Sequence, residues 1–152
     1  MIPITPFRER ARYCGPACLK MVLHYYGVHK SEKELAAISG WTYRNGTPGE
    51  GIVRAARKLG FTAFITDNAQ LVDIKRWIKK KVPVIVDWFS EDEGHYAVVV
   101  GIDRDNIYFE DPQFGHLKAM RLDVFKRVWF DFKPDMPLRE GLVVRRIIVI
   151  HR

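Results

Sequence analysis

The fold is organised around residues 13–27, which read YCGPACLKMVLHYYG. Pro16 suits a first helical turn, because its missing N–H and fixed φ cost nothing there, and Gly27 suits the left-handed residue that ends a helix. We therefore predict a helix from about Pro16 to Tyr26. Cys14 then lies beside unpaired backbone N–H groups and the positive end of the helix dipole, both of which favour a thiolate over a thiol.

The length and composition of the chain indicate one domain. A chain of 152 residues, 47% of them hydrophobic, is long enough for one domain with a hydrophobic core. It is too short to form two domains readily. We therefore expect a single domain over residues 1–152. No run approaches the ~18–20 apolar residues of a membrane span, and residues 1–6, MIPITP, lack the layout of a signal peptide. We expect a cytoplasmic protein.

The two cysteines, Cys14 and Cys18, lie four residues apart on the predicted helix. They cannot make a disulfide framework, and the further Cys and His that a zinc site needs are not nearby in the sequence. We therefore expect free thiols, as in a reducing compartment, with no metal and no cofactor. Because Cys18 falls one turn after Cys14 among apolar residues, we expect it to be a small buried hydrophobic side chain.

Positive charge is spread along the chain, whose formal net charge is +7. The densest basic run, residues 75–81, falls in the last turns of a predicted helix, where cations complement the helix dipole. The sequence shows no zinc-finger, homeodomain or aromatic RNA-binding signature. We therefore expect a solvated basic face and no nucleic-acid partner, with weak attraction to anionic partners left open.

Helical spacing dominates the first sixty residues, and strand spacing becomes common after them. Beyond the first helix, Ser31 and Glu34 match a capping box, and helices are predicted at 32–40, 47–60, 68–78 and 123–130, with Asn68 as a cap. Strands are predicted at 61–65, 83–89, 95–102, 106–111, 116–121 and 142–150. This order indicates an α+β domain in which N-terminal helices pack on an antiparallel β-sheet.

An activated thiol normally needs an imidazole partner, and His95 is the leading candidate for Cys14. His95 opens a predicted strand, and the mouth of a strand can aim a side chain at another layer. His24 and His29 lie at the far end of the first helix, about 15 Å from Cys14. His116 lies just past a predicted turn, and His151 lies at the C-terminus.

An imidazole that serves a thiolate also needs a group that holds its tautomer and stabilises its charge. Asp111 ends a predicted strand, and Pro112 prevents that strand from continuing as a central ladder. Glu110 is the weaker candidate, because its side chain points to the other face. Taken alone, Asp111 is explained equally well by ordinary turn chemistry. Together, Cys14, His95 and Asp111 form a nucleophile, base and orienter set.

These residues give the chain a resemblance to a known family. The sequence resembles the C39 and C39-like cysteine peptidases, a papain-like family whose best-known members process bacteriocin leader peptides. The matching runs are CGPACL from Cys14, YYG at 25–27, GHYAVVVG at 94–101 and Asp111-Pro112, and the likeness covers roughly residues 8–132. It implies a papain-like fold with Cys14 as nucleophile, His95 as general base and acid, and Asp111 as orienter.

The resemblance also bears on the substrate, which we expect to be a peptide or protein. Members of the family that are linked to transporters cut after a double glycine, so cleavage after small residues such as Gly-Gly is one expectation. The chain shows no transporter segment, and we expect no membrane span. The substrate sequence, the oligomeric state and a separate transporter partner stay open.

One position departs from the family pattern. The family usually has a glutamine six residues before the nucleophile, whose amide helps to bind the oxyanion, and here that position is Arg8. Arginine can donate hydrogen bonds to an oxyanion, but its longer cationic fork occupies different space. Arg8 is therefore an oxyanion candidate, and we expect it to point toward Cys14 rather than into solvent. Its presence leaves two alternatives to a peptidase: a peptide-binding domain with weak or no turnover, and a thiol acyl transferase.

The set of Cys14, His95 and Asp111 also predicts how the strands at 95–102 and 106–111 are paired. A tight two-residue turn at Arg104-Asp105 would pair Val98 with Asp111, and the acid would then face away from His95, because strand side chains alternate. We therefore predict an odd connection or a bulge near residues 103–106, which pairs Ala97 with Asp111. An Asp111 carboxylate oxygen should then lie within about 3.5 Å of a His95 ring nitrogen.

Overall fold

The computed structural model describes residues 1–10, 12–90 and 93–152. Within these ranges the helices are α1 (Cys14–Tyr25), α2 (Glu32–Ile38), α3 (Gly49–Lys58), α4 (Leu71–Lys79), α5 (Leu122–Val128) and α6 (Leu138–Gly141). The strands are β1 (Thr62–Thr66), β2 (Val84–Ser90), β3 (Glu93–Ile102), β4 (Asn106–Asp111), β5 (His116–Arg121), β6 (Phe130–Phe132), β7 (Leu142–Val144) and β8 (Arg146–His151).

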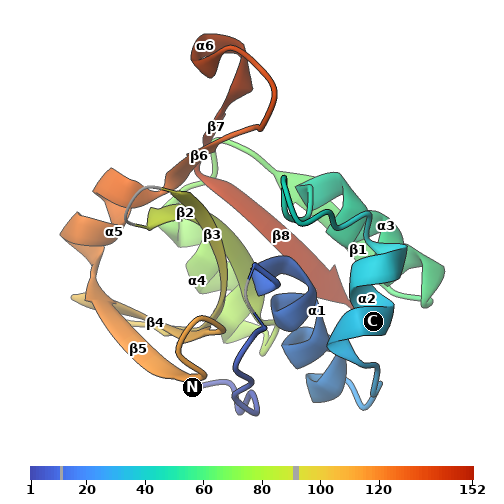
Figure 1. The fold of residues 1–152 in the computed structure, drawn as a ribbon. Helices are drawn as coiled ribbons and strands as arrows, with labels where there is room; N and C mark the ends of the chain where they lie inside the picture. Colours follow the sequence, from blue (N-terminus) through green and yellow to red (C-terminus); the bar gives the residue numbers. More distant parts are fainter. Residues whose placement is uncertain (11, 91–92) are drawn as a thin grey trace.

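A twisted antiparallel sheet forms the centre of the molecule, with helices on both faces (Figure 1). Its strand order is β1-β8-β2-β3-β4-β5, and every neighbouring pair is antiparallel. Helices α1 and α3 pack on one face, and α4 and α5 pack on the other. The predicted α+β architecture is therefore confirmed, with a second helical layer in addition to the N-terminal one.

The alternation of side chains along the central strands supplies both hydrophobic cores. On β3, Tyr96, Val98 and Val100 belong to the core beneath α1 and α3, whereas Ala97 and Val99 belong to the core beneath α4 and α5. A strand buried on both faces reads as a continuous apolar run, as residues 96–100 do. His95 lies near the start of this buried strand and is itself buried.

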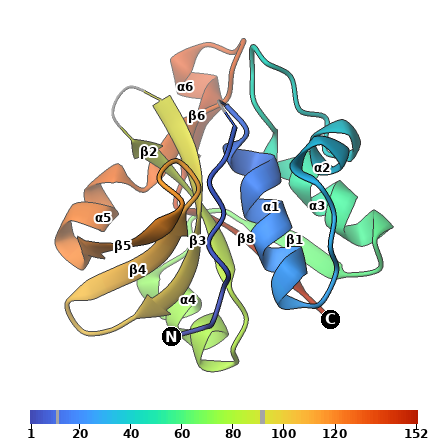
Figure 2. The same ribbon diagram turned by 60° about the horizontal axis from the view of Figure 1, so that its bottom comes forward.

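An N-terminal arm, residues 1–10, crosses the sheet on its way to α1. Figure 2 shows this dark blue segment passing between β3 and α1. The arm is held by backbone hydrogen bonds, with the Ile2 N–H donating to the Val100 carbonyl at 2.8 Å and the Glu9 N–H donating to the Pro112 carbonyl at 2.7 Å. The chain therefore reaches Cys14 along a path that β3 and β4 determine.

Helix α1 begins at Cys14, two residues earlier than predicted, so that Pro16 lies inside its first turn. The Ala17 N–H donates to the Tyr13 carbonyl at 2.9 Å, which makes Tyr13 the cap. Gly15 packs directly against Thr47, in the segment before α3, and a Cβ added to Gly15 would lie 2.7 Å from the Thr47 Cβ. The glycine after Cys14 therefore allows close contact between the start of α1 and this segment.

Three sequence predictions differ from the structure in detail. Asn68 does not cap α4: Gln70 precedes this helix, and its N–H donates to the Asp73 carboxylate at 2.8 Å, while Asn68 adopts a left-handed φ of 57°. The strand predicted at 142–150 is interrupted by Arg145, whose φ is 51°. Its first part pairs with β6, and the segment β6-α6-β7 projects from the molecule (Figure 1).

The third difference concerns the irregularity between β3 and β4. The turn at Arg104-Asp105 is a two-residue turn, with the Asp103 N–H donating to the Asn106 carbonyl at 2.9 Å, so the predicted site for a bulge was wrong. The register shift lies between Val99 and Gly101, inside the strand. It has the predicted effect, because Val98 then pairs with Glu110 and not with Asp111, and the same register extended by one residue sets Ala97 opposite Asp111.

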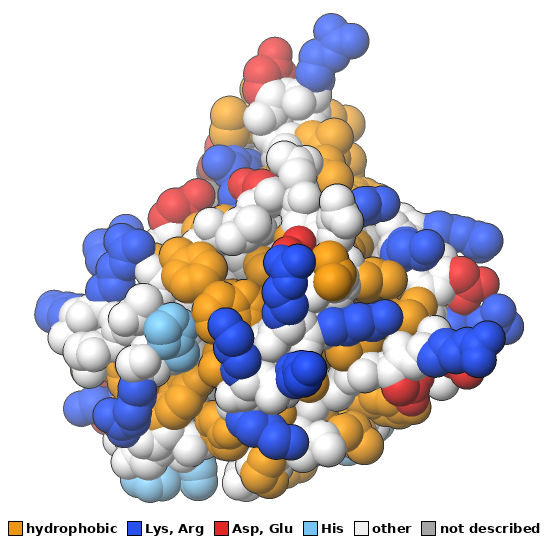
Figure 3. Space-filling view, turned by 180° about the vertical axis from the view of Figure 1, so that it is seen from behind, with side chains coloured by type: hydrophobic (Ala, Val, Ile, Leu, Met, Phe, Trp, Pro, Cys, Tyr) orange, Lys and Arg blue, Asp and Glu red, His pale blue; other side chains and the backbone are white. Residues whose placement is uncertain are grey.

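The apolar character of the helices and the distribution of surface charge both bear on function. Among the described residues, no helix combines the length and the apolar character that crossing a membrane requires. Figure 3 shows the face opposite the view of Figure 1, where Lys and Arg side chains are scattered between apolar and uncharged ones. The dispersed positive charge agrees with the distribution expected from the sequence.

We predict that Gly15→Ala destabilises the fold by about 1–3 kcal/mol, because its methyl group overlaps Thr47. Thr47→Gly should recover part of this loss in the double variant, since it removes the opposing Cβ. Urea unfolding of both single variants and the double variant measures the coupling. Strictly additive changes in the free energy of unfolding would contradict this contact.

Candidate active site

The side chains of His95 and Asp111 meet across the β3–β4 ladder. His95 Nε2 lies 2.5 Å from Asp111 Oδ1, and both side chains are nearly inaccessible to solvent, at 8% and 1% exposure. The predicted distance is therefore confirmed. A second hydrogen bond also holds Asp111, because the Gln113 N–H donates to the same Oδ1 atom at 3.0 Å. The hydrogen bond fixes the imidazole ring in one orientation.

Cys14 approaches the same imidazole from the start of α1. The Cys14 side chain is close enough to His95 for the two groups to affect each other's charge. Because Nε2 is engaged by Asp111, Nδ1 is the nitrogen that remains for the sulfur, and in the neutral ring it is the proton acceptor. The structure thus brings together the three residues that the sequence singled out, from α1, β3 and β4.

Opposing effects set the charge of the imidazole. Burial lowers the pKa of His95, but hydrogen bonds to Asp111 and Cys14, together with their charges, outweigh it and raise the pKa to about 10. For Asp111, burial raises the pKa, while the hydrogen bond and charge of His95 and the Gln113 N–H bring it below its usual range. Both shifts favour an imidazolium beside a carboxylate at neutral pH.

The second thiol has a different environment. Cys18 is completely buried, whereas Cys14 is partly exposed. Burial raises the pKa of Cys18 well above its ordinary value, and the charges of Cys14, Asp111 and Glu9 act in the same direction. The expectation that Cys18 is a buried apolar side chain is therefore confirmed.

Among the described residues, the remaining histidines make no hydrogen bond or ion pair with Cys14 or His95, although His116 on β5 is paired with Asp111 in the β4–β5 register. His24 and His29 stack edge-on with ring centroids 4.5 Å apart, at the end of α1 remote from Cys14. His116 is exposed and stacks on Phe114. His151 stacks on Trp77 with ring centroids 5.5 Å apart.

Arg8 and Glu9, two neighbouring charged residues of the N-terminal arm, have different surroundings. Arg8 is exposed, and its backbone and Cβ pack on Gly115, whose φ of 72° shapes the turn after β4. Among the described residues its guanidinium makes no hydrogen bond or ion pair that would hold it at Cys14, so its role in an oxyanion site stays a prediction. Glu9, by contrast, is half-buried, and its charge interacts with those of His95 and Asp111.

Sequence reasoning also missed a pair of acids, of which one is buried and the other partly exposed. Asp87 on β2 is 4% exposed, within hydrogen-bonding reach of Asp131 and close enough to Cys14 for their charges to interact. Burial raises the pKa of Asp87 well above its usual range, and Asp131 adds to this effect. Burial and the neighbouring Asp131 therefore both favour the protonated form of Asp87. A single acid within the apolar run 84–88 was the available signal.

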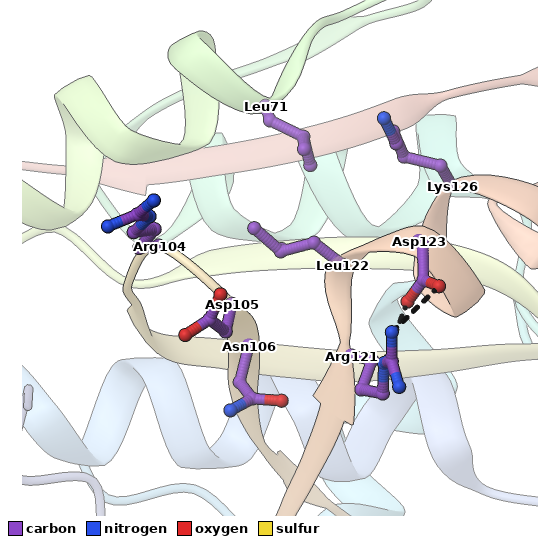
Figure 4. A pocket seen from close by; sticks show the side chains of 8 residues that line it. All are labelled: Leu71, Arg104, Asp105, Asn106, Arg121, Leu122, Asp123 and Lys126. Atoms are coloured by element: carbon purple, nitrogen blue, oxygen red, sulfur yellow. Dashed lines mark hydrogen bonds and ion pairs between the residues drawn. The ribbon is translucent and has the colours of Figure 1, made fainter.

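A surface pocket lies apart from this site. It has a volume of about 630 Å³ and lies between the start of α4, the β3–β4 turn and the start of α5 (Figure 4). Its charged walls include Arg104, Lys126 and an ion pair between Arg121 and Asp123 at 3.1 Å. The residues that line it include no cysteine and no histidine, so it lacks the nucleophile and base found at Cys14.

Comparison with known proteins identifies the family. The model of the peptidase C39 family matches residues 7–132. The chain belongs to the peptidase C39 family. Within this family the chain is 31% identical over 126 residues to the lactococcin-G-processing and transport ATP-binding protein LagD of Lactococcus lactis, covering 81% of this chain and 17% of LagD. It thus spans under a fifth of that transporter's length.

Other relatives include smaller proteins and solved peptidase domains. An uncharacterized protein of Methanothermobacter marburgensis is 35% identical over 123 residues, which cover 80% of each chain. The crystal structure of the peptidase domain of Streptococcus ComA aligns with a TM-score of 0.77 at 27% identity, covering 99% of this chain and 98% of that one. The α+β, papain-like fold expected from the sequence is that of C39 peptidase domains.

We predict that Asp111→Ala lowers the free energy of unfolding by about 3 kcal/mol in a pH-dependent manner. Because the pKa of His95 is raised to about 10, the pair contributes fully below about pH 6.5 and is lost as the pH rises through about 10. The lowered pKa of Asp111 means that the contribution also disappears in acid, below about pH 4.

Denaturant unfolding of wild type and Asp111→Ala across this range measures the difference. Asp123→Ala is the matched control, because Asp123 and its partner Arg121 are both exposed and solvent screens a surface pair, so its loss should change stability little. A difference between wild type and Asp111→Ala that is constant from about pH 4 to about pH 10 would contradict the pair.

Proposed function

We propose that the protein is a cysteine peptidase with Cys14 as nucleophile, His95 as general base and acid, and Asp111 as orienter. The observation that carries this proposal is the position of His95, hydrogen bonded to Asp111 through Nε2 and adjacent to Cys14 at the start of α1. Membership of the peptidase C39 family supports the same assignment. In this proposal, residues 1–152 form a single peptidase domain.

In the first step, the Cys14 sulfur attacks the carbonyl carbon of a peptide bond. A C–S bond forms, and negative charge develops on the carbonyl oxygen. The first N–H groups of α1 have no acceptor within the helix, so they are the donors that can stabilise this charge. His95 then gives its proton to the leaving amine as the C–N bond breaks, and a thioester remains on Cys14.

In the second step, water hydrolyses the thioester. The neutral His95 accepts a proton from water, whose oxygen attacks the acyl carbon, and the Cys14 sulfur leaves. Asp111 stabilises the imidazolium whenever the ring carries the extra proton, and its hydrogen bond keeps the other nitrogen directed at the sulfur. The reaction needs a reduced Cys14, which fits a reducing compartment such as the cytoplasm.

The proposed substrate is a peptide with small residues before the cut, such as Gly-Gly. Support comes from relatives: LagD is named for processing lactococcin G, and a solved neighbour is a double glycine motif protease in complex with a leader peptide. That neighbour is 22% identical to this chain and by itself shows the fold alone. Transport activity belongs to the longer relatives and is not part of the proposal.

A peptide-binding domain with little turnover is the second candidate function. It is favoured by Arg8, which replaces the usual glutamine and has an exposed side chain. Loss of one oxyanion donor costs about a hundredfold to a thousandfold in rate in other hydrolases. Arg8→Gln should then raise turnover by at least about tenfold if Arg8 limits the oxyanion site.

We predict that the protein cleaves a leader-type peptide containing Gly-Gly, and that Cys14→Ala and His95→Ala each lower kcat/KM by at least about a thousandfold. Cys18→Ala is the control thiol variant and should retain cleavage. Mass spectrometry of the products, with and without an added amine acceptor, separates hydrolysis from acyl transfer. Peptide binding without any cleavage would favour the second candidate, and cleavage by Cys14→Ala would refute the first.

A further inference from the structure

Glu9 lies beside the candidate catalytic centre and has no role in the mechanism above. The arm that carries it is fixed on both sides: the Glu9 N–H donates to the Pro112 carbonyl at 2.7 Å, and the Arg10 N–H donates to Glu32 Oε2 at 3.2 Å. The first bond ties Glu9 to the residue that follows Asp111. The backbone of Glu9 is therefore held at the same strand end that presents the orienter.

The surroundings of the Glu9 carboxyl are mostly acidic. Its charge interacts with groups on β3, β4 and α2, and it in turn acts on a thiol of α1. These groups are His95 and Glu93 on β3, Asp111 on β4, Glu32 on α2 and Cys18 on α1. Among the charges described as acting on Glu9, that of His95 is the largest, and it is the one that favours the ionised carboxylate.

The Glu9 carboxyl also lacks the partners that a structural acid would have. Glu9 Oε2 is buried, and among the described residues it has no hydrogen-bond partner. An unpartnered buried oxygen carries an energetic cost. Interaction with an imidazolium can offset this cost. Because the interaction between two charges is reciprocal, a carboxylate stabilised by His95 stabilises the protonated form of His95 by the same amount.

We propose that Glu9 is a second acidic positioning residue of this site, whose carboxylate acts with Asp111 to stabilise the protonated His95 that pairs with Cys14. Asp111 does so through a direct hydrogen bond to the ring, whereas Glu9 acts through its charge from the arm. The inference rests on the proposed function. It also separates the roles of two adjacent residues, since Arg8 is exposed whereas Glu9 is half-buried and its charge interacts with that of His95.

Glu9 makes the stabilisation dependent on pH. Burial raises the pKa of Glu9 to about 7, with His95 opposing the rise and Asp111, Glu32 and Glu93 adding to it. Above about pH 7 the carboxylate is ionised and stabilises the imidazolium, and below it the neutral acid does not. Protonation of Glu9 therefore weakens the support for His95 as the pH falls through about 7.

NMR of the imidazole nitrogens, followed across pH, tests this inference without requiring turnover. His95 is assigned by comparison with His95→Gln. In wild type we expect the His95 resonances to show a second, smaller inflection near pH 7, where Glu9 titrates. In Glu9→Gln, which keeps the shape and removes the charge, this inflection should vanish, and the proton affinity of His95 should fall by about threefold to tenfold.

Two further variants control the result. Glu9→Asp keeps a carboxylate and should restore an inflection. Glu110→Gln removes another buried glutamate whose Oε2 lacks a partner among the described residues, but its histidine neighbour is His116, so the His95 titration should not change. A His95 titration in Glu9→Gln that superimposes on wild type would overturn the inference. An absence of peptide cleavage would instead count against the proposed function and leave this measurement intact.

Discussion

The hydrogen bond between His95 and Asp111 is the interaction on which the site depends. Two buried ionisable groups are costly unless each stabilises the other, and here the imidazole and the carboxylate lie 2.5 Å apart with little solvent access. The bond leaves one ring nitrogen for Cys14, so the direction of proton transfer follows from the position of the acid. The bulge between Val99 and Gly101 is what places Asp111 and His95 on the same side of the ladder.

The surroundings of the site are richer in acids than the overall charge of the chain suggests. The sequence carries a formal net charge of +7, yet carboxyl groups of Glu9, Asp87 and Asp111 all lie close enough to His95 or Cys14 for charges to interact. Asp111 alone is hydrogen bonded to the ring. Carboxylates around an imidazolium stabilise it, whereas those nearer the sulfur oppose a thiolate. Their positions and protonation states therefore decide how strongly the charged forms of His95 and Cys14 are favoured.

Much of the fold and the identity of the central residues followed from the sequence. Pro16 near a helix start, the apolar run after His95 and the Asp111-Pro112 strand end are local signals, and each produced the predicted element. The place of the bulge was missed, although Gly101 inside a strand is a recognised sign of one. Asn68 was misread because asparagine serves both helix caps and left-handed turns, and only the surrounding contacts decide between them.

Other features depend on contacts between distant segments and had no local signal. The backbone of Glu9 is placed by a hydrogen bond from the arm to Pro112, more than a hundred residues later in the sequence. The pairing of Asp87 with Asp131 joins β2 to the segment β6-α6-β7, which has no strong periodicity. Such features arise from tertiary packing, so a reading of each segment alone does not reveal them.

The central claim is that Cys14 and His95 form an ion pair, and selective alkylation tests it most directly. Iodoacetamide labelling of wild type and His95→Ala, followed by mass spectrometry from about pH 5 to about pH 9, reports the reactivity of each thiol. The account predicts that Cys14 is labelled and buried Cys18 is not, with a marked loss of the reactivity of Cys14 in His95→Ala. Equal labelling of both thiols, or a Cys14 profile unchanged by the loss of His95, would contradict it.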